Sequence, residues 1–172
     1  MRTGTCVLFS IFSLVAALIF ISASCDETCG GSGSGSFTYD GNTYSLTGAG
    51  MEDFENGIFE LDIVSSSINV CEWTGTGHIV CFELFSSSTP GASGTYDWSG
   101  SGGLLFLQVG ISLDYNADSG TGTWLLIEDQ FPNAGDYLTI SASGDTYTFE
   151  FSLTMVDSKT VTGGYTGTVA VW

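Results

Sequence analysis

The residues that could carry catalysis are few, and none of them stands in a recognisable catalytic motif. His78 is the only histidine in the chain, and a Ser-His-acid mechanism requires a histidine as its base. It follows Gly75-Thr-Gly77, and no Gly-x-Ser-x-Gly sequence accompanies it that would expose a nucleophilic serine. We therefore expect His78 to be a turn or surface residue and the protein not to be an enzyme.

Acidic residues are so numerous that pairs of them carry little information. Glycoside hydrolysis uses two carboxylates about 5 to 9.5 Å apart in a cleft, and among 19 Asp and Glu residues some pair will meet that spacing. Glu52, Asp53 and Glu55 share an expected loop, and Glu128 and Asp129 are adjacent. Neither group lies in a recognisable catalytic motif, so a carbohydrate-active protein is an alternative and not the leading hypothesis.

Oxygen-bearing side chains at alternate positions suggest a calcium loop. Asp114, Asn116 and Asp118 precede Gly120, and Ca²⁺ prefers carboxylate and amide oxygens. The glycine falls one residue later than in an EF-hand loop, and Leu125 stands where that loop has a Glu. A polar hairpin turn is the default interpretation, with calcium as the alternative, and we expect no other cofactor.

Aromatic side chains offer a possible sugar-binding surface. Tyr96 and Trp98 fall on one face of an expected strand, and Trp73 lies in an expected loop. Aromatic rings in a sheet more often pack in the core or across strands. A glycan ligand is therefore an alternative, as is an apolar ligand held inside a small barrel.

Residues 1–24 have the three parts of a signal peptide. Arg2 supplies the positive start, Val7–Ile21 an apolar run, and Ser22-Ala-Ser24 the small residues that precede a cleavage site. A transmembrane helix requires about 20 apolar residues, which is more than this run supplies. We expect an exported mature chain that begins at residue 25.

Two interpretations apply to Cys25. In the first it is the lipid-bearing residue of a bacterial lipoprotein, and the Gly/Ser-rich residues 25–35 form a flexible tether. In the second it pairs with Cys29, and the protein is secreted and soluble. We prefer the first, because a flexible tether suits a domain held away from a membrane, although Ser22 stands where a lipidation motif usually has Leu.

The other two cysteines of the mature chain are Cys71 and Cys81. In an export compartment they can close a short ring by a disulfide bond, and two buried thiols are the other interpretation. With the lone His78 they lack the paired spacing of a zinc site, so zinc is not expected.

The charge of the chain excludes one large class of partners. The 19 acids face two cations, Arg2 and Lys159. Loss of Arg2 with the signal leaves one cation against 19 acids, a formal net charge of −18. Phosphate binding depends on Lys and Arg, so we expect no nucleic-acid partner.

The elements that must position these residues are β-strands. From residue 36 onward apolar and polar residues alternate, most clearly over Tyr147–Met155, and glycine-rich turns recur about every 8 to 12 residues. We predict a single all-β domain over 36–172, an antiparallel meander of about nine or ten strands that forms a β-sandwich or flattened β-barrel. The stretches 104–109 and 124–127 are apolar on both faces and are expected to be central strands.

Two stretches of sequence carry a resemblance to known proteins. They are Phe37-Thr-Tyr-Asp-Gly-Asn-Thr-Tyr-Ser-Leu46, which follows the signal, Cys25, Asp26-Glu27 and the Gly/Ser segment, and Gly144-Asp-Thr-Tyr-Thr-Phe-Glu-Phe-Ser-Leu153 with the hairpin to Thr168. In this layout the chain resembles the small secreted lipoproteins common in Bacteroidota. The resemblance implies lipid attachment and, through the acids after the cysteine, export to the cell surface, and it implies no activity.

Taken together, these patterns predict an exported, lipid-anchored domain of the cell envelope, at the outer membrane or the cell surface. Its role would be to bind or to shield without catalysis. Its partners would be the membrane, through the lipid on Cys25, and a glycan or protein ligand.

Overall fold

The computed structural model describes residues 31–128, 135–155 and 157–171. The strands in this part of the chain are β1 (Gly31–Tyr39), β2 (Asn42–Asp53), β3 (Ile58–Val64), β4 (Ile68–Asn69), β5 (Thr74–Ser86), β6 (Gly94–Tyr96), β7 (Leu104–Asn116), β8 (Trp124–Glu128), β9 (Tyr137–Ser143), β10 (Thr146–Thr154), β11 (Thr160–Gly167) and β12 (Ala170–Val171). A short 3-10 turn, η1 (Ser101–Gly103), precedes β7. Within the described ranges no helix is long and apolar enough to cross a membrane.

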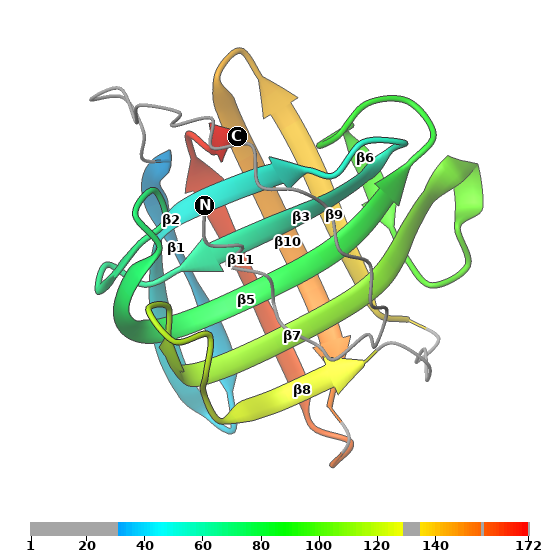
Figure 1. Ribbon diagram of the computed structural model, residues 1–172. Helices are drawn as coiled ribbons and strands as arrows, with labels where there is room; N and C mark the ends of the chain where they lie inside the picture. Colours follow the sequence, from blue (N-terminus) through cyan, green and yellow to red (C-terminus); the bar gives the residue numbers. More distant parts are fainter. Residues whose placement is uncertain (1–30, 129–134, 156, 172) are drawn as a thin grey trace, which may run out of the picture.

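All twelve strands belong to one sheet, which confirms the all-β prediction. Ten of them follow the order β6-β9-β10-β11-β1-β2-β3-β5-β7-β8, with antiparallel neighbours throughout, while β4 pairs with β5 and β12 pairs in parallel with β2. The sheet bends back on itself, so that β3, β5, β7 and β8 cross in front of β9, β10 and β11 at a large angle (Figure 1). A single parallel bridge joins Asp97, just after β6, to Leu105 of β7, and the sheet is not closed into a continuous ring.

The main core lies between the two layers. Alternate residues of each strand point inward, as the two-residue period of a strand requires, and aromatic rings meet at the centre. The Phe82 ring stacks on Phe106 with centroids 5.9 Å apart and meets the Phe151 ring at 5.6 Å. The space between the layers is therefore occupied by side chains that the alternating pattern of the sequence directs inward.

A second, smaller core lies on the opposite face of β3, β5 and β7. The segment 65–73, which includes β4, folds over this face and buries Ile68, Val70 and Trp73 against Ile79 and Tyr115. The sheet is consequently covered on both faces here, and its middle strands carry long apolar runs.

The domain starts earlier than the sequence predicts. Gly31 pairs with Ala49 of β2, and Gly35 pairs with Tyr165 of β11, so residues 31–35 of the predicted tether belong to β1. A Cβ atom on Gly35 would collide with the carbonyl oxygen of Gly164. Glycine is thus required here because the two strands approach closely. Sequence composition alone cannot distinguish this requirement from the use of glycine in a flexible tether. The predicted signal, 1–24, and residues 25–30 lie outside the described part of the chain.

The stretch 124–127 was predicted to be a central strand, and this prediction is wrong. It belongs to β8, the last strand in the order, whereas 104–109 belongs to β7, between β5 and β8. Leu125 packs against the main core, and Trp124 packs against the second one. Two covered faces therefore explain the apolar run, although one edge of the strand has no neighbour in the sheet order.

Candidate binding groove

One face of the molecule carries small hydroxyl side chains almost exclusively. It is the outer face of β1, β10 and β11, whose Phe37, Phe149 and Tyr165 side chains are buried in the main core. Successive residues of a strand point to opposite faces, so the Ser and Thr residues between these aromatics point outward. The antiparallel register aligns them across the strands in two rows, Thr148–Thr166–Ser34 and Ser152–Thr162–Thr38.

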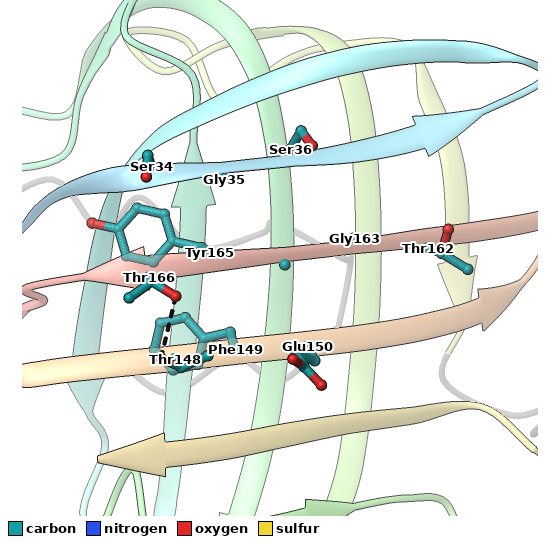
Figure 2. A pocket seen from close by; sticks show the side chains of 11 residues that line it. Ser34, Gly35, Ser36, Thr148, Phe149, Glu150, Thr162, Gly163, Tyr165 and Thr166 are labelled. Atoms are coloured by element: carbon teal, nitrogen blue, oxygen red, sulfur yellow. Dashed lines mark hydrogen bonds between the residues drawn. The ribbon is translucent and has the colours of Figure 1, made fainter. Parts of the chain in front are cut away.

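Between these two rows the surface sinks into an open groove. Glu150 of β10 pairs with Gly164 of β11, which pairs with Ser36 of β1. Because Gly164 has no side chain, a hollow of about 380 Å³ is left between the neighbouring side chains. Figure 2 shows Glu150 on the β10 side of this groove and Ser34 and Ser36 on the β1 side, with β11 between them.

The groove offers many neutral hydrogen-bonding groups and one charge. Each Ser or Thr hydroxyl can donate one hydrogen bond and accept others. The hydroxyls of Thr148 and Thr166 form a hydrogen bond with each other, with their Oγ1 atoms 3.2 Å apart. Glu150 is exposed and is the one carboxylate among the residues that line the groove. This set of groups suits a polar ligand, whereas a glycosidase mechanism would need a second carboxylate.

His78 contacts a backbone carbonyl oxygen and an aromatic ring. It sits in β5, half-buried, with Nδ1 2.7 Å from the carbonyl oxygen of Leu113 and its ring 5.0 Å from that of Tyr44. It is not among the residues that line the groove. The expected turn or surface histidine is instead a strand residue that packs against an aromatic ring.

The three candidate calcium ligands accept hydrogen bonds at the hairpin between β7 and β8, two of them from residues of the hairpin and one from β5. Asp114 accepts hydrogen bonds from the Thr123 backbone N–H at 2.6 Å and from its hydroxyl at 2.9 Å, which hold the pKa of this carboxyl below its ordinary value. Asn116 Oδ1 accepts from the Ser119 N–H at 3.0 Å, and Asp118 Oδ2 accepts from the Gly75 N–H at 3.0 Å. These contacts are those of a polar hairpin turn, and calcium binding by this loop stays a prediction.

Glu52 and Asp53 of the first acidic group point to opposite faces of β2. Asp53 at the end of β2 accepts the Glu55 backbone N–H at 2.9 Å, as a turn residue does. Asp129 lies outside the described residues. Within the described ranges no group of three His, Cys, Asp or Glu side chains is placed to hold a metal ion.

The aromatic residues proposed for sugar stacking belong to the cores. Tyr96 is fully buried, and Trp98 packs against the main core with its ring 5.2 Å from that of Phe106. Trp73 is 7% exposed and packs in the second core. Core packing, the default interpretation, is the correct one for these three residues.

Cys71 and Cys81 are both disulfide-bonded. Both belong to the second core, where Cys81 is buried and Cys71 half-buried. Their pairing with each other stays a prediction, as does lipid attachment at Cys25, which lies outside the described residues.

The hydroxyl groove is not apparent from the alternation alone. The pattern around Phe149 and Phe151 predicts a strand, but it does not distinguish a binding surface from an ordinary solvated face. A usable signal was nevertheless present, because β10 and β11 place Thr or Ser at almost every outward position, where soluble proteins commonly carry Lys and Glu.

Comparison with known proteins adds no relative. No protein-family model matches the chain, and no curated protein or solved structure matches it significantly.

Proposed function

We propose that this chain is an exported, lipid-anchored domain of the cell envelope that binds a neutral polar ligand, of which a glycan chain is the best candidate, without catalysis. The observation that carries the proposal is the groove over β1, β10 and β11. Its walls present hydroxyl groups in register across three strands, with a single carboxylate beside a glycine. Such groups can both donate hydrogen bonds to and accept them from the hydroxyl and amide groups of a sugar chain.

The charge of the domain narrows the ligand class. Lys159, the only cation left after signal removal, forms ion pairs with Asp40 at 3.1 Å and Asp157 at 3.4 Å. An anionic polymer would therefore meet a surface of its own sign. A neutral or amine-bearing glycan is compatible with Glu150, which can accept two hydrogen bonds from adjacent hydroxyls.

Export is supported by the state of the cysteines. Disulfide bonds persist in oxidising compartments and are rare in the cytosol, and Cys71 and Cys81 are disulfide-bonded. A lipid on Cys25 would hold the domain at the outer membrane or the cell surface. Without that lipid the same domain would be a secreted soluble protein.

An apolar ligand inside the sheet is the weaker candidate. Phe82 contacts both Phe106 and Phe151 within the main core. A lipid-like ligand would have to displace these rings, at the cost of their packing contacts.

The test is retention of the processed protein on a panel of insoluble polysaccharides, neutral, amine-bearing and anionic. We expect retention by a neutral or amine-bearing member and its loss in Thr162→Tyr, which places a ring in the groove. The matched control is Thr43→Tyr, which changes a threonine of β2 that is also exposed but does not line the groove. Equal retention of both variants, or no retention of the parent protein by any member, would overturn the proposal.

A further inference from the structure

The second core contains a buried acid in unusual surroundings. Asp62 of β3 is 4% exposed, and its Oδ1 atom has no hydrogen-bond partner. It pairs across the sheet with Gly50 of β2 and with Cys81 of β5. Neither neighbour offers a cation or a side-chain hydroxyl, so the carboxyl lies between a residue without a side chain and a disulfide sulfur.

Every titratable neighbour of this carboxyl makes its ionisation harder. Burial raises the pKa of Asp62 well above its ordinary value, and Glu60 on the same strand and Glu52 on β2 raise it further. From β7, burial raises the pKa of Tyr115 to about 12, and the nearby Asp62 adds to this shift. Cys81 of β5 is disulfide-bonded and does not titrate.

The cover over Asp62 is held in a strained conformation. The segment 65–73 spans the face from β2, where Val70 lies against Gly48, to β7, where the Trp73 ring lies 6.1 Å from that of Tyr115. Trp73 has a φ of 52°, in the left-handed region that a bulky residue rarely adopts. Such a conformation persists only where surrounding contacts impose it.

Two more buried polar groups under this cover interact only weakly. The Trp73 side chain interacts with the Tyr115 hydroxyl, but neither polar atom forms a close hydrogen bond. Each unsatisfied group costs free energy that contact with water would recover. Opening of the segment would therefore relieve the strain at Trp73, hydrate these two groups and allow Asp62 to ionise.

We propose that Asp62 is a pH-sensitive latch, which keeps the segment 65–73 closed over β3 and β5 while its carboxyl is protonated and releases it on ionisation. The direction of this pH effect follows from the buried environment of Asp62. A carboxyl that titrates at higher pH in the closed state stabilises that state at low pH, and this stabilisation is lost as the pH rises through the closed-state pKa. Cys71 lies within the segment and is disulfide-bonded, so the release is a local opening of the residues on either side of Cys71, which uncovers the Trp73 and Tyr115 side chains.

The experiment is hydrogen–deuterium exchange of peptides from 65–73, in the oxidised protein, from about pH 4 to about pH 9. Comparing variants at the same pH cancels the intrinsic pH dependence of exchange. In the parent protein we expect the opening constant to rise by up to about tenfold for each pH unit between the open-state and closed-state pKa values. In Asp62→Asn this rise should disappear, while the control Asp145→Asn, an exposed acid in the β9–β10 turn, should keep it.

An unchanged pH profile in Asp62→Asn would overturn the proposal. A second measurement covers the case in which that variant does not fold, namely a carboxyl-carbon NMR titration of Asp62 in the parent protein. An ordinary aspartate midpoint would also overturn the proposal, and a raised midpoint that coincides with the loss of protection at 65–73 would support it.

Discussion

Glu150 on β10 lies directly opposite Gly164 on β11, so the only carboxylate of the groove stands beside a position with no side chain. If sugar hydroxyls bind there, Glu150→Gln should weaken retention on the bound polysaccharide by about tenfold or more, because hydrogen bonds to a charged group contribute about 1.5–3 kcal/mol. Stability should change little, since Glu150 is exposed. The control is Glu55→Gln in the β2–β3 turn, and equal binding by both variants would exclude Glu150 from the site.

Gly163, the neighbour of Gly164, faces the opposite way and should be intolerant of any side chain. A Cβ atom there would lie 2.5 Å from the Phe151 ring and 2.7 Å from Phe37 Cβ. Gly163→Ala should therefore destabilise the protein by about 1–3 kcal/mol, the usual cost of overpacking a core, measured by urea unfolding. Thr162→Ala changes the adjacent outward residue and should stay within about 0.5 kcal/mol; similar losses in the two variants would contradict this account.

Asp97 should make the protein sensitive to acid. The Ser99 hydroxyl at 2.6 Å, helped by the backbone N–H groups of Ser99 and Gly100, holds the pKa of this carboxyl below its ordinary value. A lowered pKa contributes stability above the unfolded-state pKa, and that contribution is lost as the pH falls through the folded-state pKa. The urea midpoint of the parent protein should thus fall more steeply below about pH 4 than that of Asp97→Ala. Asp145→Ala is the control, and parallel curves for Asp97→Ala and the parent would refute the assignment.

The pairing of the cysteines and the lipid anchor are linked and can be decided together. If Cys71 and Cys81 bond each other, Cys25 either carries a lipid or pairs with Cys29. We expect a non-reducing peptide map to contain a linked Cys71–Cys81 peptide, and intact mass to show a diacylglyceryl group on Cys25. A peptide that links Cys25 to Cys29, Cys71 or Cys81 would exclude the anchor and leave a secreted protein.

Calcium should have little effect on stability. The Asp114 carboxylate already accepts a backbone hydrogen bond within the β7–β8 hairpin, and the Asp118 carboxylate accepts one from Gly75 of β5, so a cation would have to compete with these contacts. We expect the Tm to be the same with and without millimolar calcium. A rise in Tm that Asp114→Asn abolishes would establish a calcium site.

The sequence predicts the fold class well because alternation is a local signal. Tyr147–Met155 alternates over its whole length, and its inward residues Phe149, Phe151 and Leu153 are all buried. The order of strands in the sheet is harder to predict from the sequence, because it depends on which distant strands pair. The two-sided apolar run at Trp124 therefore predicted a central strand, whereas the second face of β8 is covered by side chains of the second core.

The groove was harder to predict than the core. Its shape depends on Glu150, Gly164 and Ser36 aligning across three strands, and Ser36 is more than a hundred residues from the other two. Glycine at 31–35 was similarly ambiguous, because the same residues that make a tether flexible allow two backbones to approach closely.

The position of β1 has a consequence for how the protein is made. This first strand lies between β2 and β11, and it pairs with β11 from Gly33 to Thr38. If the chain is exported as we propose and leaves the secretion channel N-terminus first, nearly all of it must be released before β1 can pair with both neighbours. Such long-range pairing delays folding, so the chain would stay unfolded during translocation and fold after it.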